Sequence, residues 1–264
     1  MKLATWNINS VRLRFKAVAR FLRTEAPDVL ALQETKVINS LFPAEGFAKL
    51  GYVHQAINGQ KGYHGVAILS KLPFRSQSAR EFCEKGDCRH MGAVFENGVE
   101  LHNFYVPAGG DIPDPKRNDK FAHKLAFLRE MEEMFASRAD RKTAPVVLVG
   151  DLNVAPLEND VWSHKQLLDV VSHTPVEVEL LGNAREAFEW NDVTRQFVPE
   201  DQKLYSWWSY RAADWKASDR GRRLDHIWTS PVLKNQVRAQ KILKDMRGWK
   251  QPSDHVPVVA EFEV

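Results

Sequence analysis

The stretch PVVLVGDLNVAP, residues 145–156, joins a run of apolar residues to a polar turn. The apolar run is typical of a buried β-strand, and Pro156 marks the turn that follows. Asp151 and Asn153 are separated only by Leu152. Side chains two residues apart on an extended chain point to the same side, so we expect both to face one small target. The alternative is that these residues only form a turn.

The sequence around this stretch alternates between strand-like and helix-like patterns. Strands are expected at residues 2–6, 28–33, 65–70, 92–96, 99–106, 145–150, 223–230, 237–243 and 256–264. Amphipathic helices are expected at residues 11–26 and 119–137. Asn97-Gly98 is a hairpin signal between two of the strands. Hairpins mixed with strand–helix alternation predict an α/β protein whose sheets are not purely parallel.

The chain has 264 residues, 44% hydrophobic and 27% charged, with a formal net charge of +3 and a pI near 8.8. It shows no linker or shift in composition, so we expect one domain over residues 1–264. No stretch approaches the roughly 18 apolar residues of a membrane span. The first residues lack an apolar signal-peptide core. These observations predict a cytoplasmic protein that does not enter a membrane.

The two cysteines, Cys83 and Cys88, do not form a disulfide framework. With His90 they suggest a metal site, but a structural zinc needs four ligands and no second Cys or His pair lies at the usual spacing. We therefore interpret them as reduced thiols with no role in the chemistry.

Polar residues recur at or near the ends of the expected strands. They are Asn7, Glu34, Tyr105, Asp151, Asn153, Asp225, Asp254 and His255. Sites built at strand ends are common in α/β proteins. Each residue also has a structural interpretation, since an Asp after a strand is usually a turn former. Asp225 is harder to explain in this way, because a carboxylate inside a strand needs a partner such as Arg223 or a histidine.

The chemistry that these groups share is limited. Glu, Asp and Asn offer hard oxygen ligands that suit Mg²⁺ or Mn²⁺. A carboxylate can take a proton from water, and an imidazolium can bind an anionic oxygen. Together they fit in-line hydrolysis of a phosphate ester. Serine hydrolysis is not supported, since the sequence has no G-x-S-x-G motif, and it has no P-loop or dinucleotide fingerprint.

Six motifs in this order, TWNINSVR, LQETK, YVPAG, GDLNVAP, RLDHIW and SDHVPV, resemble the exonuclease III family of apurinic/apyrimidinic endonucleases. That family belongs to the endonuclease/exonuclease/phosphatase superfamily, which includes DNase I. The likeness extends from about residue 3 to residue 262. It implies a four-layer α/β/β/α sandwich of two mixed β-sheets flanked by helices, with the site where the two sheets converge.

The resemblance also implies roles for the polar residues. Glu34 and Asn7 would lie at a Mg²⁺ site, for which Mn²⁺ can substitute, and Asp254 would complete the metal shell. Asp151 would orient or deprotonate the attacking water, and Asn153 would hold that water and the transition state; both would lie next to the metal. Tyr105 would contact the scissile phosphate or assist the leaving oxygen. Asp225 would support His255, which would bind a phosphate oxygen beside the metal.

A DNA-binding face is predicted in YSWWSYRAADWKASDRGRR, residues 205–223, where tryptophans alternate with cations. Aromatic and cationic side chains together suit a groove for phosphates and an unstacked or missing base. The candidates are Trp207, Trp208, Arg211 and Arg222, with Lys116 and Arg117 from a second loop. The alternative is a tryptophan-rich core beside a solvated loop.

Three features depart from the family pattern. Ala108 occupies a position where many relatives carry Asn or Gln, so one hydrogen bond to the phosphate is missing or supplied elsewhere. The loop at residues 109–118 is rich in proline and acid. Arg222 occupies a position that is apolar or aromatic in some relatives. The first departure concerns a contact to the phosphate, the second concerns strand penetration and substrate preference, and the third concerns the sugar pocket.

The sequence thus predicts a Mg²⁺-dependent DNA-repair nuclease that cuts 5′ to abasic sites and trims 3′ ends as a 3′→5′ exonuclease. Its expected partner is double-stranded DNA with abasic sites or blocked 3′ ends, bound by a monomer. A phosphatase of the same fold, acting on inositol phosphates or phospholipid head groups, is the first alternative. A non-catalytic nucleic-acid-binding module is the second.

Overall fold

The computed structural model describes residues 1–212 and 214–264 and contains two large β-sheets packed face to face. The first sheet has the spatial order β13 (Val237–Ile242), β14 (Val258–Phe262), β1 (Lys2–Asn7), β2 (Val29–Gln33), β4 (Val66–Ser70) and β3 (His54–Asn58). The second has the order β5 (Phe74–Ser78), β6 (His90–Phe95), β7 (Glu100–Tyr105), β8 (Val146–Asp151), β12 (Asp225–Thr229) and β9 (Asn191–Asp192).

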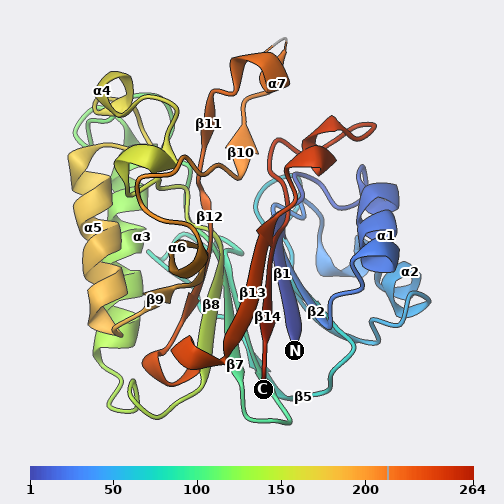
Figure 1. The fold of residues 1–264 in the computed structure, drawn as a ribbon. Helices are drawn as coiled ribbons and strands as arrows, with labels where there is room; N and C mark the ends of the chain where they lie inside the picture. Colours follow the sequence, from blue (N-terminus) through green and yellow to red (C-terminus); the bar gives the residue numbers. More distant parts are fainter. Residues whose placement is uncertain (213) are drawn as a thin grey trace.

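Each sheet contains one parallel pair, β1 with β2 and β7 with β8, and its other pairs are antiparallel. A short hairpin of β10 (Trp207–Trp208) and β11 (Gly221–Arg222) extends beyond the end of the sheets, next to α7 (Trp215–Ser218) (Figure 1). The two chain termini lie near the opposite end of the sheets. The prediction of mixed sheets is therefore confirmed.

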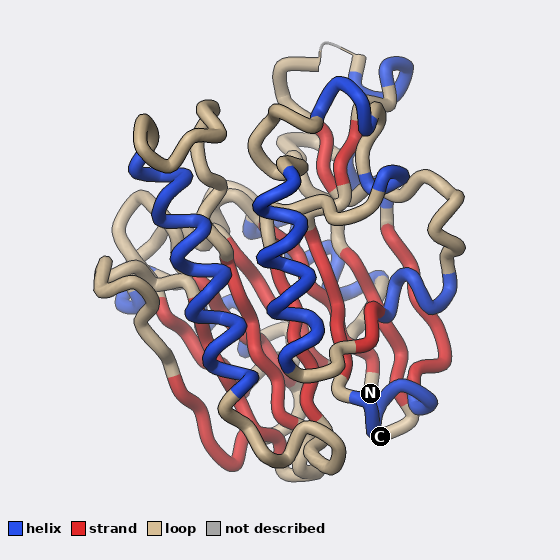
Figure 2. Tube along the Cα trace, turned by 90° about the vertical axis from the view of Figure 1, so that its left-hand side faces the viewer, coloured by secondary structure: helices blue, strands red, loops and turns tan. Residues whose placement is uncertain are grey.

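Helices cover the outer face of each sheet. In Figure 1, α1 (Phe15–Thr24) and α2 (Ala44–Ala48) lie on one side, and α3 (Asp119–Ala136) and α5 (Pro175–Ala187) lie on the other. Figure 2 shows α3 and α5 side by side in front of the second sheet. Two shorter helices, α4 (His164–Leu167) and α6 (Val193–Phe197), lie in the connections. The order helix, sheet, sheet, helix confirms the predicted four-layer sandwich.

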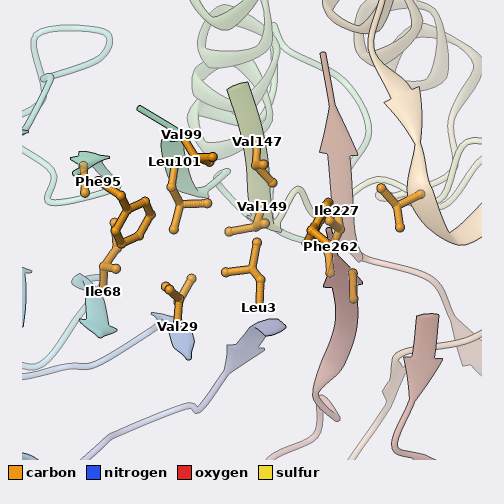
Figure 3. Packing of buried hydrophobic residues seen from close by; sticks show 14 of the residues in the cluster. Leu3, Val29, Ile68, Phe95, Val99, Leu101, Val147, Val149, Ile227 and Phe262 are labelled. Carbon is orange, nitrogen blue, oxygen red and sulfur yellow. The ribbon is translucent and has the colours of Figure 1, made fainter. Parts of the chain in front are cut away.

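Three apolar layers hold this arrangement together. The central layer lies between the sheets, where Leu3 and Val29 of the first sheet face Leu101, Val147 and Val149 of the second (Figure 3). Separate clusters fill the space under α3 and α5 and the space under α1. β2 and β8 are buried on both faces, which explains why their sequences are almost continuously apolar.

The structure corrects the expected extent of the first helix. We expected residues 11–26, but α1 runs from Phe15 to Thr24. Asn9 and Ser10 have positive φ angles of 46° and 86°, which end β1 in a tight loop, and Ala26, with φ of 47°, directs the chain away after the helix. Val11 donates its backbone N–H to Thr35 O, 3.1 Å away, instead of joining the helix. The loop before α1 therefore packs against the loop that carries Glu34.

The elements that were not predicted from sequence include β3, β5 and α5. The start of α5 does have a sequence signal, because Thr174 and Glu177 form a capping box and Pro175 occupies the first turn. The edge strand β5 is mostly exposed and polar, so it lacks the apolar pattern of a strand. Within the described residues, no helix is long and apolar enough to cross a lipid bilayer.

Candidate active site

The two sheets bring their polar strand ends together at the end of the molecule that carries β10 and β11 (Figure 1). Asn7 is the last residue of β1 in the first sheet, and Asp151 is the last residue of β8 in the second. Asn7 Nδ2 donates to Asp151 Oδ2 over 2.8 Å, so the sheets are joined at this point. Tyr105 of β7 and Asp225 of β12 lie beside Asp151 in register on either side.

A chain of polar contacts extends from Asn7 through the loops of the first sheet. Asn7 Nδ2 also donates to Glu34 Oε1 over 2.9 Å, and Lys36 Nζ lies 2.7 Å from Glu34 Oε2. Lys36 donates to Asn9 Oδ1, and Asn9 Nδ2 donates to Asp254 Oδ1 over 3.1 Å. Glu34 and Lys36 have φ angles of 51° and 53°, and these left-handed conformations turn the loop toward the site. Glu34 and Asp254 therefore belong to one network.

Asp151 and Asn153 contact each other, while Leu152 between them is buried under the helices. Asn153 donates its backbone N–H to Asp151 Oδ1 over 3.0 Å and its side-chain Nδ2 to Asp151 Oδ2 over 3.2 Å. It also donates to Val106 O over 2.9 Å. The chain turns at Asn153 with a φ of 53°. Both polar side chains therefore face the same space.

His255 lies between two carboxylates. Its Nδ1 is 2.8 Å from Asp225 Oδ2, and its Nε2 is 3.6 Å from Asp151 Oδ2. Burial alone would lower the pKa of His255, but Asp225 and Asp151 outweigh that effect and raise it to about 10. The imidazole is therefore charged at neutral pH and carries a proton on both nitrogens, of which Nδ1 is bonded to Asp225. A protonated imidazole can donate to an anionic oxygen, which is the role that the resemblance implies for His255.

The carboxylates of the site differ in basicity. Burial raises the pKa of Asp151 to about 7, with His255 opposing the rise and Asp225 adding to it. Burial also disfavours ionisation of Glu34, but Lys36 and Asn7 outweigh it and keep the pKa of Glu34 below its ordinary value. Asp151 is therefore the more basic of the two carboxylates, and Glu34 ionises more readily.

Tyr105 is buried beside the same carboxylates. Burial, followed by the charges of Glu34 and Asp151, raises the pKa of its phenol well above the ordinary value. The Arg89 guanidinium lies 4.9 Å from the Tyr105 ring centroid and bonds to the Tyr105 carbonyl. The phenol therefore keeps its proton and acts as a hydrogen-bond donor.

We call the connected set of charged and amide groups the acidic ring. Its members are Asn7, Asn9, Glu34, Lys36, Asp151, Asp225, Asp254 and His255. It contains four carboxylates and only two cations, Lys36 and His255. Hard oxygen donors in negative excess fit a divalent cation such as Mg²⁺. Asp151, Asp225 and His255 offer ligand atoms within 4.8 Å of one another, and Glu34 lies on the other side of the Asn7 amide, which bonds to both Glu34 and Asp151.

A cavity of about 650 Å³ opens onto the acidic ring. Its lining includes Glu34, Asp151, Asn153, Asp254 and His255. It also includes an aromatic and cationic group that we call the recess, formed by Trp162, Val170, Val171, Ser172, Trp207, Arg220, Arg222 and Leu224. Ala108 and Gly110 form part of the wall, so the departure at Ala108 lies within the cavity. The cavity wall thus combines acidic and amide side chains with an aromatic and cationic recess.

The predicted DNA-binding residues divide between the cavity and other places. Trp207 and Arg222 are half-buried in the recess, and Arg211 lines the cavity from the exposed loop after β10. Lys116 and Arg117 are exposed on the 109–118 loop and are not among the described residues that line the cavity.

Trp208 corrects a prediction, because it is only 1% exposed. It packs with Tyr205 and Val256, and its Nε1 donates to Asp219 Oδ1 over 2.9 Å. Successive side chains of a strand point to opposite faces, so β10 presents Trp207 to the cavity and Trp208 to the interior. The structural interpretation therefore holds for Trp208.

Sequence reasoning missed several residues that shape the site. Asn9 and Lys36 close the acidic ring, and Ser172 and Trp162 line the recess. Lys124 on α3 is fully buried, pairs with Glu177 of α5 and donates to Asn153 O over 2.7 Å. The signal for Lys124 was a cation on the apolar face of a predicted helix, which requires a buried partner.

Comparison with known proteins gives concordant results. Residues 4–255 match the model of the endonuclease/exonuclease/phosphatase family. An exodeoxyribonuclease from Bacillus subtilis (strain 168) is 32% identical over 269 residues, covering 98% of each chain. An AP endonuclease from Archaeoglobus fulgidus has a TM-score of 0.92 and 31% identity, covering 100% of both chains. A 3′ phosphatase from Neisseria, solved bound to a product DNA hairpin, has a TM-score of 0.91 and 29% identity, again covering 100% of both.

Proposed function

The chain belongs to the endonuclease/exonuclease/phosphatase family, and we propose that it cuts DNA 5′ to abasic sites and trims 3′ ends with Mg²⁺. It is a phosphodiester hydrolase of the exodeoxyribonuclease III type that acts in DNA repair. The observation that carries the finer proposal is the acidic ring, which joins both sheets and opens onto a recess with Trp207 and Arg222 in its wall. The relative solved with a DNA hairpin supports a DNA substrate.

Asp151 is the proposed base for the attacking water. Burial raises the pKa of this carboxyl group, which makes it a stronger base than an exposed aspartate, and Asn153, which is bonded to it, would hold the same water through its amide. Asp225 and His255 then face the phosphate from the other side. The His255 Nε2 proton is available to a non-bridging oxygen, since Nδ1 is committed to Asp225. The charge that develops on the phosphate is thereby stabilised by a fixed donor.

Glu34, with Asn7 and Asp151, would hold Mg²⁺, or Mn²⁺ in its place. When bound, the cation would polarise the phosphoryl oxygens and offset their charge. Asp254 would complete the shell from the far side of the ring, where its oxygens accept from Asn9 and from Trp207 Nε1. Tyr105 would donate its phenol proton in a hydrogen bond to the leaving oxygen or the scissile phosphate.

The DNA duplex would lie across the end of the molecule that carries the cavity. Trp207, Arg211 and Arg222 would contact the residue bound beside the scissile phosphate, and Lys116 with Arg117 would meet the backbone farther away. One bound site requires no symmetry partner, so we propose a cytoplasmic monomer with a single domain over residues 1–264. The inositol phosphate alternative is not favoured, because the relatives found over the whole chain are DNA enzymes.

The test is incubation with a 5′-labelled duplex that contains one tetrahydrofuran abasic analogue, with Mg²⁺ or with chelator. We expect a single product that ends in a 3′-hydroxyl immediately 5′ to the analogue, and no product with chelator. A duplex with a 3′-terminal phosphate reports end-trimming in parallel. An intact abasic duplex in Mg²⁺, together with turnover of inositol phosphates, would contradict the proposal.

A further inference from the structure

Arg222 is held against the wall of the recess by neutral groups. It is the cross-strand partner of Trp207, and its Cζ lies 5.3 Å from that ring centroid. Its Nη1 donates to Val171 O over 3.0 Å and to Ser172 Oγ over 2.7 Å. These contacts fix the guanidinium in place without neutralising its charge.

The charge of Arg222 has no carboxylate partner. Among the described residues, no acid lies within ion-pairing distance of it, whereas the adjacent Arg223 pairs with both Asp160 and Asp192. The Glu177 carboxylate acts on the pKa of Arg222, but it is already paired with Lys124. Burial accordingly lowers the pKa of Arg222. A half-buried guanidinium without a counter-ion is an unfavourable arrangement unless a ligand supplies the anion.

Arg222 also has a free donor. Both side-chain hydrogen bonds of Arg222 come from Nη1, and Nε is buried with no partner. Nη2 has no partner within the part of the chain that the structure covers, and it is not among the buried unpaired atoms. Nη2 is therefore accessible to a ligand. A guanidinium with a free amino group is well suited to phosphate oxygens.

Trp207 places this donor one aromatic ring away from the acidic ring. The Trp207 Nε1 donates to Asp254 Oδ2 over 3.0 Å, and the face of its indole lies against Arg222. The acidic ring, where the scissile phosphate would bind, thus meets the edge of Trp207, and Arg222 lies against its face. The phosphate that follows a residue bound in the recess would then come within reach of Arg222.

We propose that Arg222 is a specificity-determining residue that binds the phosphate following the residue in the recess, which deepens the proposed function and rests on it. A residue inside a strand has phosphates on both sides and reaches both the acidic ring and Arg222. A 3′-terminal nucleotide with a free hydroxyl has only the scissile phosphate and cannot use Arg222. The enzyme therefore gains from Arg222 at internal sites, not at chain ends.

The test compares two substrates made from one duplex: an internal tetrahydrofuran residue, and an unmodified 3′-terminal nucleotide. We expect Arg222→Leu to lower kcat/KM for internal incision by about 10- to 100-fold, which is the scale of one phosphate contact. The loss of kcat/KM for terminal release should be at least tenfold smaller. The salt dependence of binding to the internal duplex should weaken by about one phosphate contact. Arg222→Lys, which keeps the charge, should restore most of that salt dependence.

Two further variants keep the result interpretable. Ser172→Ala removes one anchor of Nη1 and should give a smaller change of the same sign. Arg238→Leu is the matched control, since this exposed arginine pairs with Glu263 and does not line the cavity. It should change neither rate.

Equal losses on both substrates would overturn the proposal, because Arg222 would then serve DNA binding in general. A larger loss in terminal release would also overturn it and would assign Arg222 to the base of the bound nucleotide. If the wild-type protein cuts neither substrate, the proposed function fails first. If it cuts both and the variants do not alter their ratio, only the role of Arg222 fails.

Discussion

Two buried charge clusters, whose members Arg223 and Asp225 are two residues apart in the sequence, differ in how their charges are balanced. The structural cluster consists of Arg195, Arg223, Asp160 and Asp192. Every guanidinium nitrogen of Arg223 donates to a carboxylate, over distances of 2.7–2.9 Å, and Arg195 adds a bond to Asp160. The acidic ring, which includes Asp225, has four carboxylates and two cations. Asp225 Oδ1 is buried in it without a hydrogen-bond partner.

The difference separates charges that serve the fold from charges that serve chemistry. In the structural cluster each charge has a fixed partner, so nothing more can bind there. In the acidic ring the excess negative charge is unfavourable until a cation arrives, and such imbalance is typical of functional sites. The same substitution should therefore have opposite consequences in the two clusters.

Asp151→Asn gives the largest expected effect. It removes the proposed base, so cleavage of the abasic duplex should fall by about 10³- to 10⁴-fold. The fold should be retained, because the change removes one of several mutually repelling charges. Asp192→Asn is the matched control in the structural cluster and should lower stability while each folded molecule still cuts DNA. Turnover near that of the wild type in Asp151→Asn would refute its assigned role.

Arg223→Met tests the balanced cluster. The variant leaves Asp192 buried with no cation and Asp160 with Arg195 alone, so the free energy of unfolding should fall by about 3–5 kcal/mol. Urea unfolding followed by tryptophan fluorescence measures the change. A loss below about 1 kcal/mol, a size typical of exposed pairs, would mean that the cluster contributes little to the fold.

His226, next to the structural cluster, provides a pH-dependent test. Its Nε2 lies 2.9 Å from Val154 O, its Nδ1 is buried and unpaired, and burial followed by the Arg223 charge lowers its pKa to about 4. As the pH falls through about 6.5, His226 therefore takes up a proton in the unfolded chain but stays neutral in the folded chain. Stability from this residue is present above about pH 6.5 and is lost as the pH falls toward 4, with about 2 kcal/mol lost by pH 5.

The measurement is urea unfolding of the wild type and of His226→Gln at pH 7 and pH 5. The wild type should lose more stability on acidification than the variant, since one proton fewer is taken up when the variant unfolds. Parallel losses in the two proteins would contradict the assignment.

The sequence predicted the residues of the site better than the loops that connect them. Asp151 and Asp225 stand at strand ends, where apolar runs give way to acids, and strand pairing brings such ends together. Asn9 and Lys36 were missed because they act from tight turns with left-handed backbone, which no periodicity reveals. Trp208 was placed wrongly because a two-residue strand gives too little pattern to tell its faces apart.

The fold was predictable where strands are buried on both faces, as in β2 and β8. It was not predictable in β5, an exposed edge strand whose sequence is polar. Lys124 shows a further limit. Its position on an apolar helix face was visible, but its partner Glu177 lies on α5, a helix that was not expected, and only tertiary packing brings the two together.

The central claim is that the charge excess of the acidic ring binds a divalent cation through Glu34. Calorimetric titration of the metal-free protein with Mn²⁺ tests it directly, in the wild type, in Glu34→Gln and in the exposed control Glu263→Gln. We expect the wild type and the control to bind Mn²⁺ with equal affinity, and Glu34→Gln to bind it at least tenfold more weakly, about 1.4 kcal/mol. Equal binding by Glu34→Gln, or no binding by the wild type, would contradict the account.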